Sequence, residues 1–185
     1  MHKQRGRILG RRSIHVRPAI IDDRERYGDW EIDTVIGKRG SGAIVTLLER
    51  KSRFYLVKKV TSKHADAVAD ATIAMLQPFK VLVHSITADN GLEFADHERI
   101  VEELDTDVYF ADPYASYQRG ANENANGLLR QYVPKGTDLR NVTNELMAKY
   151  QQRLNLWPRK TLGFIQPDII FKEQLQQAMS ECCSF

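Results

Sequence analysis

Asp33, Asp89 and Glu123 are the acids whose positions suit metal-assisted chemistry. Asp33 lies in a short alternating segment, Asp89 directly follows an apolar run, and Glu123 lies in a stretch rich in asparagine and glycine. Carboxylates from two strands and a helix can hold two Mg²⁺ ions about 4 Å apart, which activates a water and stabilises a leaving oxygen. The three acids therefore predict a site that cuts phosphodiesters.

The segment around Asp33 has the period of a strand. Side chains of a strand alternate between its faces, so Glu31, Asp33 and Val35 share one face, and Trp30 and Ile32 lie on the other. An unpaired carboxylate buried in a medium of low dielectric constant is destabilised by several kcal/mol. Each acid is therefore exposed, paired with a cation or bound to a metal, and the sequence leaves these choices open.

Asp89 ends an apolar run and is followed by Asn90 and Gly91. Ligands of open α/β sheets bind at the carboxyl ends of the strands, which favours a functional role for Asp89. Asp-Asn-Gly is also an ordinary turn sequence, so a purely structural role remains an alternative.

The segment around Glu123 is a poor helix by propensity, because residues 118–127 (QRGANENANG) place asparagine and glycine where alanine or leucine would stabilise a helix. Such a local conflict often marks a functional site. A loop is the alternative, but residues 128–132 continue with helical spacing. Arg130 follows Glu123 by seven residues, two turns along the same face, which would align a carboxylate with a phosphate-binding guanidinium.

Other chemical motifs are weak. The glycine-rich segment 37–42 (GKRGSG) lacks the spacing of a phosphate-binding loop and is typical of a hairpin turn. The five histidines have no metal-ligand spacing. The two cysteines, Cys182 and Cys183, are adjacent, so they form no disulfide framework and indicate a reducing compartment.

The elements that position the three acids follow from periodicity. We expect a meander of three antiparallel strands, then alternating helices and strands in the order βββαβαβ, and two further helices. Ser62 is the expected N-cap of the first helix, which Pro78 ends. The expected strands are 29–36, 43–48, 54–60, 81–88 and 108–111, and the expected helices are 62–77, 94–104, 123–132 and 145–156.

Length and composition indicate one globular unit. With 185 residues and 42% hydrophobic side chains, the chain is long enough for a full core. We expect a basic extended arm or linker at 1–26, a catalytic core at 27–171 and a tail at 172–185. No apolar run approaches the roughly 18 residues of a membrane span, and no secretory signal follows Met1, so we expect a cytoplasmic protein without membrane contact.

Positive charge is concentrated in two blocks although the net charge is only +3. Residues 1–20 contain six bases and no acid, and residues 119–160 contain eight bases and three acids. The segment between them is acidic. Two basic blocks around an acidic centre suit an enzyme that holds a phosphate backbone and gathers acids around metal ions. A solubilising arm and solvated helix faces are the alternative interpretation.

The chain resembles DDE transposases of the retroviral-integrase superfamily, and closely the insertion-sequence-thirty family. The resemblance covers about 17–171 and rests on segments 28–34 (GDWEIDT), 87–94 (TADNGLEF), 109–114 (YFADPY) and 118–124 (QRGANEN). Thirty-three residues separate Asp89 from Glu123, which is the spacing of this family. The family triad then corresponds to Asp33, Asp89 and Glu123.

The resemblance implies a fold, a cofactor and partners. The fold is α/β and ribonuclease-H-like, with a five-stranded mixed sheet flanked by helices, in agreement with the order from periodicity. The implied cofactor is Mg²⁺, as two ions that Mn²⁺ can replace, and the implied partners are DNA, as transposon ends and target, and further copies of the chain. Arg119 and Arg130 match basic residues of the family and would contact DNA.

The sequence thus favours a transposase catalytic domain that cleaves DNA and transfers strands, without a small-molecule substrate. Asn90, Asn122 and Asn124 are candidates to form hydrogen bonds with the metal-binding carboxylates and so to orient them. A nuclease of the same fold that never joins strands is one alternative. Another is a non-catalytic DNA-binding or dimer-poisoning fragment, because family members carry an amino-terminal helix-turn-helix region and this chain resembles the catalytic portion alone.

Overall fold

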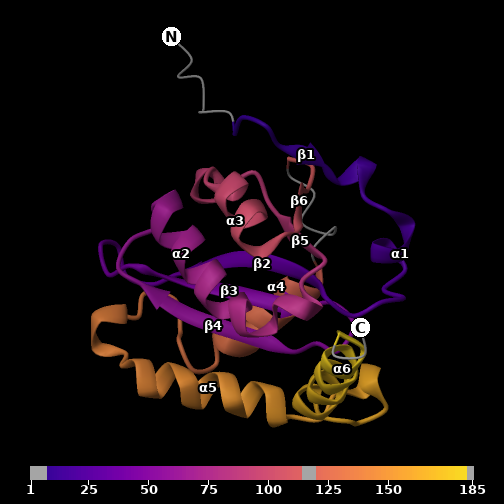
Figure 1. Cartoon of the computed structure of the whole chain (residues 1–185). Helices are drawn as coiled ribbons and strands as arrows, with labels where there is room; N and C mark the ends of the chain where they lie inside the picture. The colour runs from indigo at the N-terminus through magenta and orange to yellow at the C-terminus, as the bar shows by residue number, and fades with distance from the viewer. Residues whose placement is uncertain (1–7, 114–119, 183–185) are drawn as a thin grey trace.

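The computed structural model describes residues 8–113 and 120–182, which form a six-stranded mixed sheet with helices on both faces (Figure 1). The strand order across the sheet is β1-β6-β5-β2-β3-β4. The strands are β1 (Arg12–Ser13), β2 (Asp29–Ile36), β3 (Ala43–Glu49), β4 (Tyr55–Val60), β5 (Ser85–Ala88) and β6 (Asp107–Phe110).

The pairing confirms the predicted meander and the predicted α/β class. Strands β2, β3 and β4 are antiparallel neighbours, and β5 and β6 extend the sheet in parallel from β2. All five predicted strands are present, but the number five is wrong, because β1 adds a sixth. Its two residues have no periodicity of their own, and only the parallel pairing of Arg12 with Tyr109 makes them a strand.

The four predicted helices are present, but three of them begin three residues away from the predicted start, at Ala65, His97 and Gly120. The first long helix begins at Ala65, and its N-cap is His64 rather than the predicted Ser62. A 3₁₀ run at Gln77–Leu82 delays the next strand to Ser85. The α-helices are α1 (Ala19–Asp22), α2 (Ala65–Leu76), α3 (His97–Leu104), α4 (Gly120–Leu129), α5 (Asn144–Leu156) and α6 (Pro167–Cys182).

The core has two layers, one on each face of the sheet. Trp30 and Ile32 of β2 belong to a cluster with α2, α3 and Phe171, whereas Val35 belongs to a cluster with α4 and α5. This division confirms the predicted alternation along β2. The face that carries Glu31, Asp33 and Val35 is therefore the face that α4 and α5 cover.

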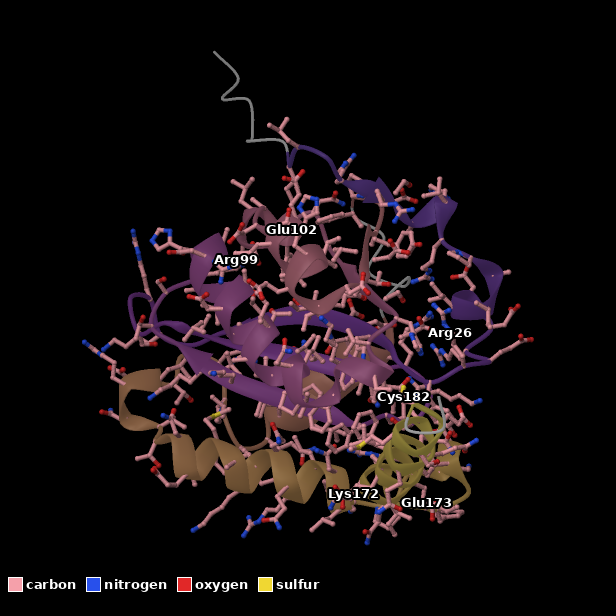
Figure 2. The ribbon with its side chains drawn as sticks, viewed as in Figure 1. Arg26, Arg99, Glu102, Lys172, Glu173 and Cys182 are labelled. Carbon is pink, nitrogen blue, oxygen red and sulfur yellow. The ribbon has the colours of Figure 1, made fainter. Side chains whose placement is uncertain are left out.

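Helix α6 was not predicted. Phe171 is 1% exposed and stacks on Phe54 with ring centroids 4.2 Å apart, and it meets the edges of Trp30 and Phe79. Lys172 and Glu173 lie on the side of α6 that is turned away from the sheet (Figure 2). The helix therefore docks by a narrow apolar stripe on an otherwise polar sequence, which is a weak periodic signal.

The described part of the predicted arm lies against the core. Ile14 and Ile21 are buried, and the Arg17 side chain is only 4% exposed. The division of the chain at residues 26 and 171 stays a prediction. Among the described residues, no helix is both long and apolar enough to cross a membrane.

Candidate active site

Asp89 directly follows β5, and Asp33 lies in the carboxyl-terminal half of the adjacent parallel strand β2. Strands β2 and β5 pair Trp30 with Ile86 and Glu31 with Thr87. Continuing this register by two residues places Asp33 opposite Asp89, on strands about 4.8 Å apart. Paired residues of parallel strands project to the same face, so the two carboxylates are neighbours at this edge of the sheet.

Asp33 is held by hydrogen bonds from two sides. Its Oδ1 accepts from the backbone N–H of Thr34 at 2.8 Å, and its Oδ2 accepts from Asn126 Nδ2 at 2.9 Å. The Asn126 amide is itself fixed, because Tyr55 Oη donates to Asn126 Oδ1 at 2.6 Å. Burial raises the pKa of the Tyr55 phenol, so it stays a donor. A relay from Tyr55 through Asn126 therefore orients the Asp33 carboxylate.

Asp89 forms the turn that the sequence offered as one of its two roles. Its Oδ1 accepts from the Gly91 backbone N–H at 2.8 Å, which closes a turn directly after β5. Asn90 points elsewhere: its Oδ1 accepts from Arg11 and its Nδ2 donates to the carbonyl of Ala111. Asn90 thus ties the amino-terminal segment to the residues after β6.

Helix α4 crosses the same face and presents asparagines to β2. The backbone N–H of Asn122 donates to Glu31 Oε2 at 3.0 Å, one turn before the contact of Asn126 with Asp33. Glu123 follows Asn122 and is exposed, on the neighbouring face of the helix. The Asn122 side chain is buried and its amide atoms have no hydrogen-bond partner in the described structure.

The three predicted acids are only partly brought together. Asp33 and Asp89 are neighbours by register, and Glu123 lies on the helix that contacts Asp33 through Asn126. Within residues 8–113 and 120–182, no group of three or more His, Cys, Asp or Glu side chains lies close enough to hold a metal ion. Mg²⁺ is commonly bound by one or two carboxylates together with water and substrate phosphates, so the Asp33 and Asp89 pair fits this ion.

Glu31, which shares the face of Asp33, has a different role. Arg50 Nε donates to Glu31 Oε1 at 3.0 Å, and both side chains are almost completely buried. Burial lowers the pKa of the Arg50 guanidinium, and the Glu31 charge opposes that change. Glu31 therefore fixes α4 and the β3–β4 turn to β2, and Asp33 is the acid of this strand that lies nearer to the carboxyl edge of the sheet.

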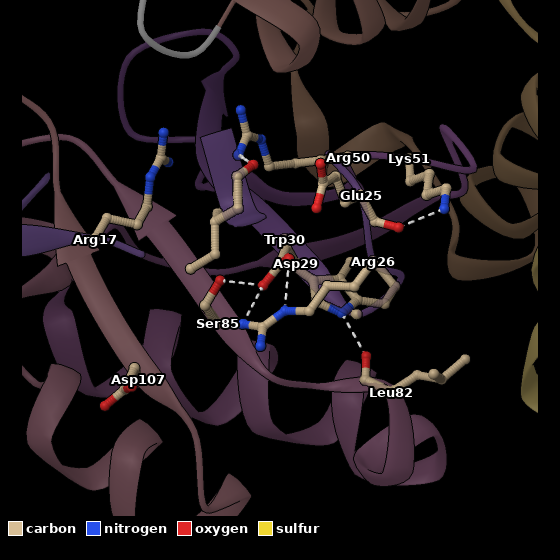
Figure 3. A network of polar contacts seen from close by, with 12 residues as sticks. Arg17, Glu25, Arg26, Asp29, Trp30, Arg50, Lys51, Leu82, Ser85 and Asp107 are labelled. Atoms are coloured by element: carbon tan, nitrogen blue, oxygen red, sulfur yellow. Dashed lines mark hydrogen bonds and ion pairs between the residues drawn. The ribbon is translucent and has the colours of Figure 1, made fainter. Parts of the chain in front are cut away.

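A second buried network fixes the start of β2. Asp29 is 1% exposed and accepts from Arg26 Nε and Nη2, both at 3.0 Å, and from Ser85 Oγ at 2.6 Å (Figure 3). Trp30 Nε1 donates to the carbonyl of Leu82 at 2.9 Å. These contacts set the register of β2 against β5, on which the alignment of the two acids depends.

The predicted DNA contacts are placed only in part. Arg130 donates from Nη2 to the Ile36 carbonyl at 2.9 Å, which holds its guanidinium at the end of β2. Arg119 lies outside the described residues. Asn124 is exposed and lines a cavity beside α4.

Sequence reasoning missed Tyr55 and Asn126. Asn126 lies four residues after Asn122, so helical spacing could have placed both asparagines on one face. Tyr55 has the pattern of an ordinary apolar strand residue, and only the folded arrangement of α4 and β4 reveals its hydroxyl contact.

Comparisons with known proteins agree with this geometry. The chain is 47% identical over 173 residues to the transposase of insertion sequence element IS4351 from Bacteroides fragilis, covering 94% of this chain and 53% of that protein. It is 40% identical over 166 residues to the transposase InsI of insertion sequence element IS30A from Escherichia coli K12, covering 89% and 43%. The chain thus spans about half the length of the curated relatives it matches.

The fold also matches a solved structure. The catalytic core domain of BIV integrase superimposes with a TM-score of 0.61 at 20% identity, over 81% of this chain and 97% of that one. This similarity shows that the fold is ribonuclease-H-like, as predicted. No family model matches the chain.

Proposed function

We propose that this chain, which by sequence belongs with the insertion-sequence transposases of the IS30 family, is a catalytic core that cleaves DNA and transfers the freed strand. The observation that carries this proposal is the register of β2 and β5, which aligns Asp33 with Asp89 at the carboxyl edge of the sheet. The relatives are named transposases. We infer the activity of these longer proteins for this chain.

The proposed cofactor is Mg²⁺, with Mn²⁺ as a substitute, bound by Asp33 and Asp89 and joined by Glu123 when DNA is present. A bound divalent ion would supply charge stabilisation at the phosphate and a more acidic water. Asp33 is suited to this role, because the N–H groups of Thr34 and Asn126 donate hydrogen bonds that orient its carboxylate.

The chain's own residues position the reactants. Asn126, held by Tyr55, keeps the Asp33 carboxylate in one orientation, and the turn at Gly91 does the same for Asp89. Glu123 is one turn away from Asn126 on α4 and is exposed, so it can approach a phosphate from the helix side. The freed 3′ hydroxyl would then attack the phosphorus of a target phosphodiester at the same carboxylates, and the target's own 3′ oxygen would leave as the new P–O bond forms.

The proposed partners are transposon ends and target DNA. Arg119 and Arg130 are the proposed backbone contacts, and assembly of two or more copies on paired ends is part of the proposal. Strand joining separates a transposase from a nuclease that only hydrolyses.

The test is cleavage and joining of a labelled DNA duplex by the purified chain with Mg²⁺ or Mn²⁺. We expect the Asp89→Asn variant to lose cleavage at least a hundredfold while its melting temperature stays near that of the unchanged chain. Asp105→Asn is the matched control, because Asp105 is exposed at the end of α3 with φ 51°, a conformation that asparagine tolerates.

Undiminished cleavage by Asp89→Asn would overturn the proposed site. Cleavage without joined products would favour a nuclease, and binding without any cleavage would favour a non-catalytic DNA-binding fragment.

A further inference from the structure

A cavity of about 270 Å³ lies beside α4, and none of the three proposed catalytic acids lines it. The α4 residues that line it include Ala121, Asn124 and Leu128, which lie roughly 100–160° around the helix axis from Glu123. Its apolar wall is formed by Leu48, Tyr55, Ala121, Ala125, Leu128 and Leu154. The cavity is therefore on the opposite flank of α4 from the face that carries Glu123.

Three arginines line this cavity without a described carboxylate partner. Neither the Arg24 side chain nor the Arg53 side chain has a hydrogen bond or an ion pair with any described residue. Arg159 donates from Nη2 to the Leu154 carbonyl at 2.8 Å, but no described acid pairs with it. The rim of the cavity therefore carries three guanidinium groups without a direct ion pair to a described acid, although Glu31 and Glu49 attract the charge of Arg53 from a greater distance.

The neighbouring buried arginines differ in this respect. Arg50 pairs with Glu31 and Arg17 pairs with Asp22, so each has its own carboxylate. Glu49, the other buried acid nearby, accepts from the backbone N–H groups of Gly28 and Ser52 instead. These described acids are thus already engaged outside the cavity.

Partial burial destabilises the charges of Arg53 and Arg159, whereas Arg24 is exposed. Desolvation lowers the pKa of the Arg53 guanidinium, and repulsion by Arg24 lowers it further. Burial also lowers the pKa of the Arg159 guanidinium. An anion in the cavity would offset the cost of desolvation by its attraction to the guanidinium groups, and it would reduce the repulsion between them.

The backbone provides an independent observation. Arg24 has φ 56° and Arg53 has φ 64°, and they are two of only four described non-glycine residues with positive φ. Glycine or asparagine would adopt this left-handed conformation more easily than arginine. Arginine at both positions indicates that the side chains are needed, since the backbone alone would favour a smaller residue.

We propose that Arg24, Arg53 and Arg159 form a binding pocket for a phosphate group of a nucleic-acid backbone, separate from the catalytic acids. The guanidinium group matches phosphate because its planar fork donates two parallel hydrogen bonds. Gly120 and Ala121, at the amino end of α4, form part of the wall and add a partial positive charge. The assignment to DNA rests on the proposed function, whereas the preference for phosphate rests on the arginines.

A neighbouring cavity supports a DNA strand as the source of this phosphate. It has a volume of about 490 Å³, its lining includes His15, Arg17 and Arg50, and it shares Arg24, Gly120 and Ala121 with the first cavity. The two cavities therefore form a continuous path around the first turn of α4. Arg24 lines both cavities and has no carboxylate partner among the described residues, whereas Arg17 and Arg50 are already paired with acids of the chain. A strand that leaves the catalytic acids could follow this path.

The test compares DNA binding by the unchanged chain with binding by the double variant Arg24→Asn and Arg53→Asn. Asparagine tolerates positive φ, so we expect the melting temperature to be maintained or raised. Affinity for a labelled duplex should fall about tenfold at constant salt, because the variant can no longer donate charge-assisted hydrogen bonds from these positions. The slope of log K against log salt should become shallower by about 0.9 for each phosphate that the variant no longer neutralises.

Arg153→Gln is the matched control, because Arg153 is exposed on α5 and has no described carboxylate partner. We expect this variant to keep the affinity within about twofold and the slope unchanged, since one exposed charge away from the DNA path releases no counterion. If the double variant binds DNA like the unchanged chain, the pocket proposal is overturned and the proposed function is unaffected.

A second probe separates the two proposals. Inorganic pyrophosphate should raise the melting temperature of the unchanged chain and not that of the double variant. If the unchanged chain binds no DNA, the proposed function fails. The change in melting temperature with pyrophosphate then decides by itself whether the pocket binds phosphate. If pyrophosphate raises the melting temperature but the double variant keeps the salt slope of DNA binding, the pocket binds free phosphate and DNA is rejected as its ligand. If neither the melting temperature nor the salt slope changes, the pocket proposal is overturned.

Discussion

At the scale of single residues, the relay to Asp33 is the feature that sequence reasoning could not supply. Tyr55 and Asn126 come from β4 and α4, 71 positions apart, and meet only in the folded chain. Asp33 and Asp89 were predictable because one lies in a strand with a clear period of two, the other follows an apolar run, and both match motifs of the family that the chain resembles. The strand period alone did not separate Asp33 from Glu31, and the family resemblance selected Asp33. The pairing of Glu31 with Arg50 is visible only in the folded chain.

Replacing Tyr55 with Phe should slow DNA cleavage without weakening DNA binding. The ring would keep its packing, but Asn126 would lose the hydrogen bond that orients it toward Asp33. We expect kcat to fall several-fold with KM unchanged, and the free energy of unfolding to fall by about 1 kcal/mol. Steady-state kinetics with a labelled duplex checks this. Tyr132→Phe, a tyrosine stacked on Tyr150, is the control, and an equal loss in both variants would contradict the relay.

Replacing Glu31 with Gln should destabilise the fold strongly. Arg50 would keep its charge in a buried position without a carboxylate, and breaking such a pair costs about 3–5 kcal/mol. Urea denaturation measures the loss. Glu102→Gln on the exposed face of α3 is the control and should change the free energy of unfolding by less than about 0.5 kcal/mol (Figure 2). Similar stability of both variants would mean that the ion pair contributes nothing.

His84 should make stability depend on pH. Burial lowers the pKa of its imidazole below the ordinary 6.5, and the nearby Arg26 charge lowers it further. The unfolded chain therefore takes up a proton at a higher pH than the folded chain, so stability present above pH 6.5 is lost as the pH falls below it. Denaturation of the unchanged chain and of His84→Gln between about pH 8 and pH 5 checks this. A constant difference between them would contradict the prediction.

At the scale of elements, strands were predictable and α6 was not. The period of two in β2 is set by local sequence, and both faces of that strand are as predicted. In α6 only Phe171, Leu175 and Ala178 pack on the core, and most of its other residues are polar. A stripe this narrow becomes visible only when the aromatic cluster that receives it is known.

The docking of α6 predicts a large effect of Phe171→Ala. The ring stacks on Phe54 and meets Trp30 and Phe79, so its loss leaves a cavity in the core. We expect the free energy of unfolding to fall by about 3–5 kcal/mol. Phe164→Ala is the control, because Phe164 is 71% exposed and its loss should change little. Equal denaturation midpoints for both variants would show that α6 does not dock as described.

At the scale of the whole molecule, two arginines of the amino-terminal segment neutralise the protein's own acids. Arg12 pairs with Asp107, and Arg17 pairs with Asp22 and donates to Thr87 at 2.9 Å. The sequence left open a DNA-binding or a solubilising role for this segment. Charge counts alone do not show which cations are paired with acids of the same chain. Arg24 and Arg53, which have no described carboxylate partner, instead line the cavity beside the first turn of α4.

This distribution of charge predicts that Arg17 acts on stability and not on DNA binding. Arg17→Gln would leave Thr87 without its buried partner and Asp22 without its cation, so the free energy of unfolding should fall by about 1–3 kcal/mol. Arg12→Gln is the control, because that pair is about half exposed and contributes about 0–1 kcal/mol. Both variants should keep the salt dependence of DNA binding, since each guanidinium is already paired with a carboxylate of the chain. A shallower salt slope for Arg17→Gln at unchanged stability would instead assign this segment to the DNA interface.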